Sequence, residues 1–120
     1  MSKAYDFGKK AEDLAAAYLI KSGYTVLERN YRYLKAEVDL IAQKEDLLVA
    51  VEVKARSDGF VLAPHEAVTK KKIQLLVSAV DHYIQSRDMD VSVRFDLITY
   101  VLEKGIWQRD HIEDAFYPFG

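Results

Sequence analysis

Five consecutive apolar residues, Leu47 to Val51, are followed directly by Glu52, Val53 and Lys54. A continuous apolar run of this length is typical of a strand that is covered on both faces and is therefore central in its sheet. Because side chains alternate along a strand, Glu52 and Lys54 share one face, about 7 Å apart by strand rise. Charges at the end of a buried strand are costly, so this segment predicts a covered sheet with a polar site at the strand's end.

The segments before this strand predict its hairpin partner and one further strand. Aromatic and β-branched residues are frequent over 24–33, and a second strand is predicted over 36–43. The polar connection that leads to the third strand, 47–54, is short enough for an antiparallel hairpin. The strands at 36–43 and 47–54 are therefore expected to pair.

Two amphipathic helices are predicted, one before and one after these three strands. Apolar residues recur at helical spacing over 7–19, and the pair Ser22 and Gly23 provides a stop signal. After a loop that extends through Pro64, a second helix is expected over about 66–87. Both helices present an apolar stripe that can cover the sheet.

The last quarter of the chain predicts another strand over 91–102 and a short fifth strand over 105–108. An irregular or helical tail that contains His111 and Phe116 is expected after them. The resulting order, α-β-β-β-α-β, predicts an α/β fold with a mixed β-sheet and flanking helices. Residues 1–120 are expected to form a single domain.

Composition excludes several classes of protein. The chain has no cysteine, which excludes disulfides, thiolate nucleophiles and cysteine-ligated metal sites. A net charge of −2 speaks against a protein that coats DNA without regard to sequence, so any contact with nucleic acid has to be local. No segment has the apolar length of a secretion signal or a membrane span, and a soluble, cytoplasmic protein is expected.

Asp39, Glu52 and Lys54 form the most informative arrangement in the sequence, because they lie on two strands that are predicted to pair. Carboxylate oxygens of Asp39 and Glu52, with the main-chain carbonyl of Val53, suit a hard cation such as Mg²⁺ or Mn²⁺. Such an ion can activate water for attack on a phosphodiester. Lys54 could hold that water or the phosphate, and Glu12 of the first helix could complete the acidic cluster.

The same residues also have an ordinary explanation. Glu52 and Lys54 could be exposed charges at a sheet edge that pair with each other or with Glu37 and Arg56. Exposed charges at strand ends are common, so on spacing alone this explanation is the more frequent one.

The segments Ala36–Ile41 and Val51–Arg56 resemble the D-(spacer)-E-x-K core of the PD-(D/E)XK nuclease superfamily. More narrowly, nearly the whole chain resembles the small uncharacterised bacterial YraN-like family, which is endonuclease-like in fold. Two departures, Ala11 and Ala36 where that family often has glycine, exchange one small residue for another.

This resemblance implies a restriction-endonuclease-like fold and a role for each matching residue. Asp39 and Glu52 would be metal ligands, Lys54 the catalytic lysine and Glu12 the acid carried by the helix. The implied cofactor is Mg²⁺ or Mn²⁺, and the implied partner is nucleic acid, DNA in the first place.

Four basic residues are candidates for contacts with nucleic-acid phosphates: Arg32, Arg56, Lys70 and Lys72. Lys70 and Lys72 lie near the start of the second helix, where the helix dipole disfavours positive charge, so an anionic partner would explain them. A solvated basic face explains them equally well.

The leading hypothesis is a metal-dependent nuclease that hydrolyses DNA phosphodiester bonds, with branched DNA among the candidate substrates. The alternative is a non-catalytic module that binds nucleic acid or a protein partner on a nuclease fold. In a third reading these charges only stabilise the sheet. A homodimer is left open, since no apolar stripe can be assigned to an interface rather than to the core.

Overall fold

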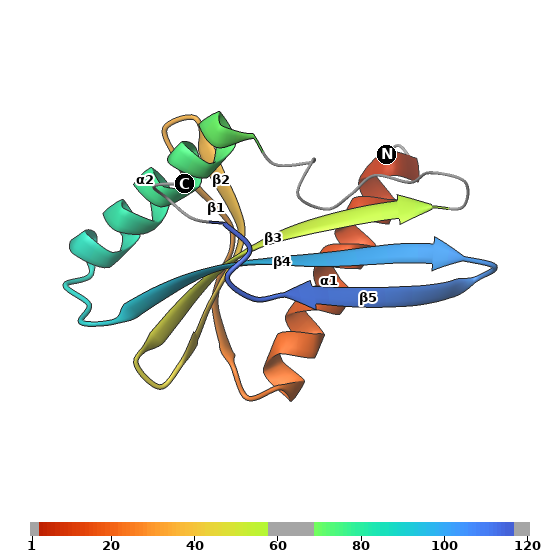
Figure 1. Ribbon diagram of the computed structural model, residues 1–120, viewed down its shortest axis with the longest axis horizontal. Helices are drawn as coiled ribbons and strands as arrows, with labels where there is room; N and C mark the ends of the chain where they lie inside the picture. Colours follow the sequence, from red (N-terminus) through yellow and green to blue (C-terminus); the bar gives the residue numbers. More distant parts are fainter. Residues whose placement is uncertain (1–2, 58–68, 117–120) are drawn as a thin grey trace.

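Within residues 3–57 and 69–116, the part of the chain that the computed structural model describes, two helices and five strands follow in the order α-β-β-β-α-β-β (Figure 1). They are α1 (Lys3–Lys21), β1 (Thr25–Tyr33), β2 (Ala36–Lys44), β3 (Leu47–Ser57), α2 (Lys70–Ser86), β4 (Ser92–Glu103) and β5 (Ile106–Ile112). No helix in these ranges is both long and apolar enough to cross a membrane.

The strands form one mixed sheet in the order β1-β2-β3-β4-β5. All neighbouring strands are antiparallel except β3 and β4, which are parallel, so the chain has to return through α2 between them. β3 is the central strand, as its continuous apolar run predicts. The predicted mixed sheet with flanking helices is therefore confirmed.

The two helices cover opposite faces of the sheet. Val49 and Val51 of β3 pack in a core with α1, whereas Leu48 and Ala50 pack in a second core with α2. This division follows from strand alternation, which sends successive side chains to opposite faces. It also puts Glu52 on the face that α2 covers.

The sheet divides between β2 and β3. Their register runs from Lys44↔Leu47 only as far as Leu40↔Val51. Beyond that pair, β2 continues along β1 while β3 continues along β4, and Figure 1 shows β1 and β2 turning away from the other three strands. Asp39 and Glu52 are the first residues on each strand past this division, which we call the fork.

Two details differ from the sequence-based prediction. The expected short strand at 105–108 is longer, so the prediction of an irregular or helical tail is wrong for His111, which pairs with Ile98 inside β5. An edge strand with mostly exposed polar residues has little apolar periodicity to reveal it. The second helix begins at Lys70 behind the N-cap Thr69, and residues 66–68 of its predicted range lie outside the described residues.

A buried polar network joins β4, β5 and α1. Asp96 is fully buried, and its carboxylate accepts hydrogen bonds from Arg94 at 2.8 and 2.9 Å. His111 Nε2 lies 2.7 Å from the same carboxylate, and His111 Nδ1 lies 2.8 Å from the Tyr18 hydroxyl. The Arg94 and Asp96 pair is thus structural, and it ties the edge strand to the first helix.

Asp96→Asn is expected to destabilise the protein by about 3 kcal/mol, because it leaves a guanidinium without its buried counter-charge. The measurement is the midpoint of urea unfolding, with Asp110→Asn on the exposed side of the same hairpin as the control. Equal midpoints for the two variants would contradict a structural role for the network.

Candidate functional site

Asp39 is fixed at the fork by the backbone of the neighbouring strand. The Val53 N–H donates a hydrogen bond to Asp39 Oδ2 at 2.8 Å. Because β2 and β3 no longer pair here, the carboxylate takes the place of a main-chain acceptor. Asp39 therefore has little freedom to turn away from the next residue across the fork, Glu52.

Glu52 is a buried carboxylate, only 2% exposed, at the end of the apolar run of β3. Lys72 Nζ of α2 lies 2.7 Å from Glu52 Oε2, and Lys54 Nζ lies 3.8 Å from the same atom. Neither Glu52 oxygen accepts a well-oriented hydrogen bond from the described residues, so the short approach of Lys72 is an electrostatic contact. The alternative explanation is therefore wrong about the exposure of Glu52, whereas the ion pair it expects between Glu52 and Lys54 is present.

Burial and the neighbouring Glu52 raise the energy of the charged form of Asp39. Burial, and after it the Glu52 carboxylate, raises the pKa of Asp39 from 3.8 to about 8, against the opposing effect of the Val53 N–H. Burial acts to lower the pKa of Lys72, but Glu52, together with Asp39 and Glu37, outweighs it and raises that pKa. Positive charge is thus favoured at the fork, and a second negative charge is disfavoured.

These residues fit a hard divalent cation. Mg²⁺ is commonly held by one or two carboxylates and completes its octahedron with water and substrate phosphate oxygens. Asp39 and Glu52 supply two carboxylates, and neither oxygen of Glu52 accepts a well-oriented hydrogen bond from the described residues. In the described ranges no group of three or more His, Cys, Asp or Glu side chains is gathered tightly enough to hold a metal.

Glu12 lies close to the fork but is held by other partners. It lines a cavity of about 450 Å³ together with Asp39 and Val53. Its Oε1 accepts hydrogen bonds from Asn30 at 2.8 Å and from Arg29 at 3.2 Å. Glu12 therefore faces the same space as Asp39 without joining the acidic pair, and its role as a metal ligand stays a prediction.

The predicted phosphate-binding residues lie in different places. Arg32 lines the same cavity and pairs with Glu37 at 2.9 Å, while Lys70 is exposed at the start of α2. Arg56 is half-buried, and its guanidinium donates to the carbonyl of its neighbour Ala55. A role in binding nucleic acid stays a prediction for all three.

Lys72 makes a contact that the sequence interpretation did not identify. The sequence makes it a candidate for substrate phosphate, a role that stays a prediction, and the structure places its Nζ against Glu52. A signal for this position exists: Lys72 precedes the buried Leu76 by four residues, which puts both on the face of α2 that meets the sheet. Arg29 and Asn30 were likewise not identified as partners of Glu12.

A model of the uncharacterised protein family UPF0102 matches residues 11–100. The UPF0102 protein FP2501 of Flavobacterium psychrophilum is 48% identical over 119 residues, which cover 99% of this chain and 100% of the relative. A UPF0102 protein of Parabacteroides distasonis is 46% identical over 117 residues, covering 98% and 97%. A solved structure of a Holliday junction resolvase from Archaeoglobus fulgidus matches with a TM-score of 0.46 and 15% identity, covering 94% of this chain and 93% of that one.

Asp39→Asn is expected to stabilise the metal-free protein more at pH 8 than at pH 5. The raised pKa means that folding holds a proton on Asp39, so the wild type loses stability as pH rises from 3.8 toward about 8. Asparagine does not titrate, and its oxygen can still accept from Val53. Thermal unfolding in chelator should show a gain of about 5 °C at pH 8 for a domain of this size.

The matched control for that titration is Asp46→Asn, which removes an exposed acid from the hairpin turn. It should show no gain that grows with pH. If Asp39→Asn instead destabilises the protein at both pH values, the charges stabilise the sheet and the site interpretation is wrong.

Lys72→Met is expected to destabilise the metal-free protein by about 2 kcal/mol at pH 7, because the buried Glu52 carboxylate loses its nearest cation. Chemical unfolding measures the loss, and Lys71→Met, at the exposed neighbouring position, is the control. Added Mn²⁺ should reduce this loss of stability, since a cation between Asp39 and Glu52 replaces the ammonium of Lys72. A variant as stable as wild type without metal would contradict the assigned contact.

Proposed function

We propose that this chain, which belongs to the uncharacterised protein family UPF0102, is a metal-dependent nuclease that hydrolyses DNA phosphodiester bonds at the fork. Its membership of this family confirms the predicted resemblance to a small uncharacterised bacterial family. One observation carries the proposal. Glu52 is 2% exposed, accepts no well-oriented hydrogen bond at either carboxylate oxygen despite the nearby Lys72 ammonium, and faces a second acid, Asp39. A structural carboxylate would be expected to have its acceptors satisfied, whereas a cation-binding carboxylate keeps them available.

Asp39 and Glu52 would hold Mg²⁺ or Mn²⁺, with the Val53 carbonyl as a further oxygen ligand. When bound, such an ion supplies a water of lowered pKa and neutralises charge that develops on the phosphate. The Val53 N–H keeps Asp39 oriented toward that position through its 2.8 Å hydrogen bond. Glu12 would join from α1 on release from Arg29 and Asn30.

The lysines have separate tasks in this proposal. Lys54 Nζ lies 3.8 Å from Glu52 Oε2, close enough to donate to an attacking water or to a phosphate oxygen beside the acids. Lys72, at 2.7 Å, occupies the positive position at Glu52 in the metal-free state. It becomes available to bind substrate phosphate when a divalent ion takes over that charge.

DNA is the proposed substrate, with branched DNA among the forms to be tested. Arg32, Lys70 and Arg56 would contact the backbone around the fork, in keeping with a net charge of −2 that allows only local attraction. Arg32 lines the cavity that contains Asp39, so it is the one of the three best placed to reach a phosphate near the acids.

A specific observation favours a second candidate, a module that binds nucleic acid or a protein partner without cleavage. Only two acids gather at the fork among the described residues, and Glu12 is engaged by Arg29 and Asn30. A site that stays in this state would bind without completing hydrolysis.

Cleavage of labelled linear duplex, single-stranded and four-way-junction DNA should require Mg²⁺ or Mn²⁺. Asp39→Asn, Glu52→Gln and Lys54→Ala should each lower the rate by about 100-fold or more, because each removes charge stabilisation at the reacting phosphate. The substrate cut fastest identifies the substrate class.

Asp46→Asn, which is remote from the fork, should retain the wild-type rate. Activity that persists in Asp39→Asn would assign the cleavage to another source. Absence of cutting by the folded wild-type protein on every substrate, with or without metal, would favour the binding module.

A further inference from the structure

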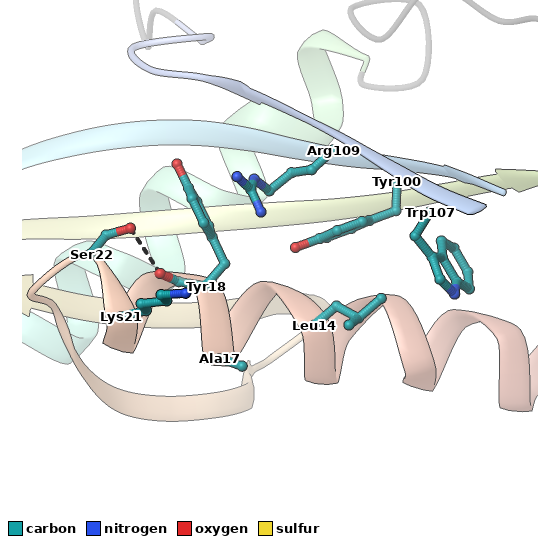
Figure 2. A pocket seen from close by; sticks show the side chains of 8 residues that line it. All are labelled: Leu14, Ala17, Tyr18, Lys21, Ser22, Tyr100, Trp107 and Arg109. Carbon is teal, nitrogen blue, oxygen red and sulfur yellow. Dashed lines mark hydrogen bonds between the residues drawn. The ribbon is translucent and has the colours of Figure 1, made fainter.

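A second opening lies on the other side of α1 from the cavity that contains Glu12. It is a groove of about 690 Å³ between α1 and the strands β4 and β5, a volume within the usual range for ligand sites (Figure 2). Its lining comes from α1 and the turn after it, from β4 and from β5: Leu14, Ala17, Tyr18, Lys21, Ser22, Tyr100, Trp107 and Arg109. The nuclease proposal uses none of these residues.

The charge of the groove is positive. Lys21 and Arg109 are exposed cations, and no acid is among the lining residues. The Arg109 guanidinium lies over the Tyr18 ring at 3.8 Å from the ring centroid and close to Tyr100, and as an exposed side chain it can still contact a ligand in the groove. This combination selects an anion with a planar group.

The aromatic side chains are held in place before any ligand arrives. Trp107 is half-buried, stacks on Phe7 with ring centroids 5.0 Å apart and meets the ring of the buried Tyr100 edge to face at 6.1 Å. Tyr18 is anchored through its hydroxyl to His111, which in turn contacts the buried Asp96. A rigid aromatic surface binds with a smaller loss of conformational entropy.

Figure 2 shows Tyr18, Arg109 and Tyr100 converging above α1, with Trp107 at the end of the groove. Below them, Ala17 and Ser22 are small and exposed, which keeps the groove open to solvent on that side. A ligand can therefore enter along the helix and place a flat group beside Arg109 or Trp107.

We infer that this groove binds an unpaired, single-stranded segment of nucleic acid, with a base stacked on Trp107 or Arg109 and its phosphates at Arg109 and Lys21. Aromatic side chains beside cations are the means by which proteins bind single strands without reading sequence. A duplex cannot use such a groove, because its base faces are already stacked on each other.

The inference rests on the proposed function and narrows its substrate class. Since α1 separates the groove from Asp39 and Glu52, an unpaired segment is bound away from the scissile phosphodiester. The substrate then combines a strand to be cut with an adjoining single-stranded region.

Trp107 is the only tryptophan in the chain, so its fluorescence reports on the groove directly. The wild-type protein is titrated in EDTA, where no cleavage can occur, with an eight-residue oligothymidylate, a blunt duplex of the same length and thymidine monophosphate. The single strand should quench Trp107 to saturation. Arg109→Ala should weaken its binding by about tenfold, the loss of one stacking partner and one phosphate contact.

Arg87→Ala is the matched control, because Arg87 is an exposed arginine that also lies 3.8 Å over a tyrosine ring, that of Tyr83, outside the groove. It should bind the oligonucleotide as wild type does. Equal binding by Arg109→Ala and wild type would overturn the inference. So would equal affinity for the duplex or for the free nucleotide.

Failure of this inference and failure of the proposed function give different results. Metal-dependent cleavage that is sensitive to Asp39, combined with unchanged binding in Arg109→Ala, would remove only the groove. Loss of single-strand binding in Arg109→Ala, without cleavage of any substrate, would establish the groove and reject the nuclease.

Discussion

The repulsion between a buried carboxylate, Glu52, and a partly buried one, Asp39, is the constraint on which the rest of the site depends. Asp39 and Glu52 meet where β2 leaves β3, in a place where burial makes each charge costly. The chain offsets this with a single main-chain N–H at Asp39 and with two lysines at Glu52. Neither Glu52 oxygen accepts a well-oriented hydrogen bond from the described residues, and under the proposed function a divalent cation would take over part of that compensation.

Helix α1 lies between the cavity at the fork and the groove beside Trp107. On one side it presents Glu12 to the cavity at Asp39, and on the other Tyr18 to the groove beside Trp107. The network through His111 and Asp96 fixes the helix against β4 and β5, so the separation between the two openings is set by the fold. A substrate that reaches both has to pass across or around this helix.

The strands that form the fork could be predicted from the sequence, because the central strand and its hairpin partner have the strongest local sequence patterns. The run Leu47–Val51 identified the central strand, and the short hairpin connection put Asp39 and Glu52 on two strands that were expected to pair. Contacts that depend on tertiary packing could not be predicted in the same way. The pairing of Lys72 with Glu52 and of Glu12 with Asn30 joins elements far apart in the chain, and no local pattern encodes their distance. The predicted length of β5 was too short because an exposed edge strand lacks apolar alternation.

The proposal that Asp39 and Glu52 hold a divalent cation can be tested by measuring the binding of Mn²⁺. This measurement depends neither on the choice of substrate nor on turnover. Titration followed by calorimetry or by the electron paramagnetic resonance of the free ion should show saturable binding to the wild-type protein. Asp39→Asn and Glu52→Gln should each abolish it, while Asp46→Asn, outside the fork, should leave it unchanged. Binding of equal strength in the wild type and in both fork variants, or no binding to the wild type, would contradict the account.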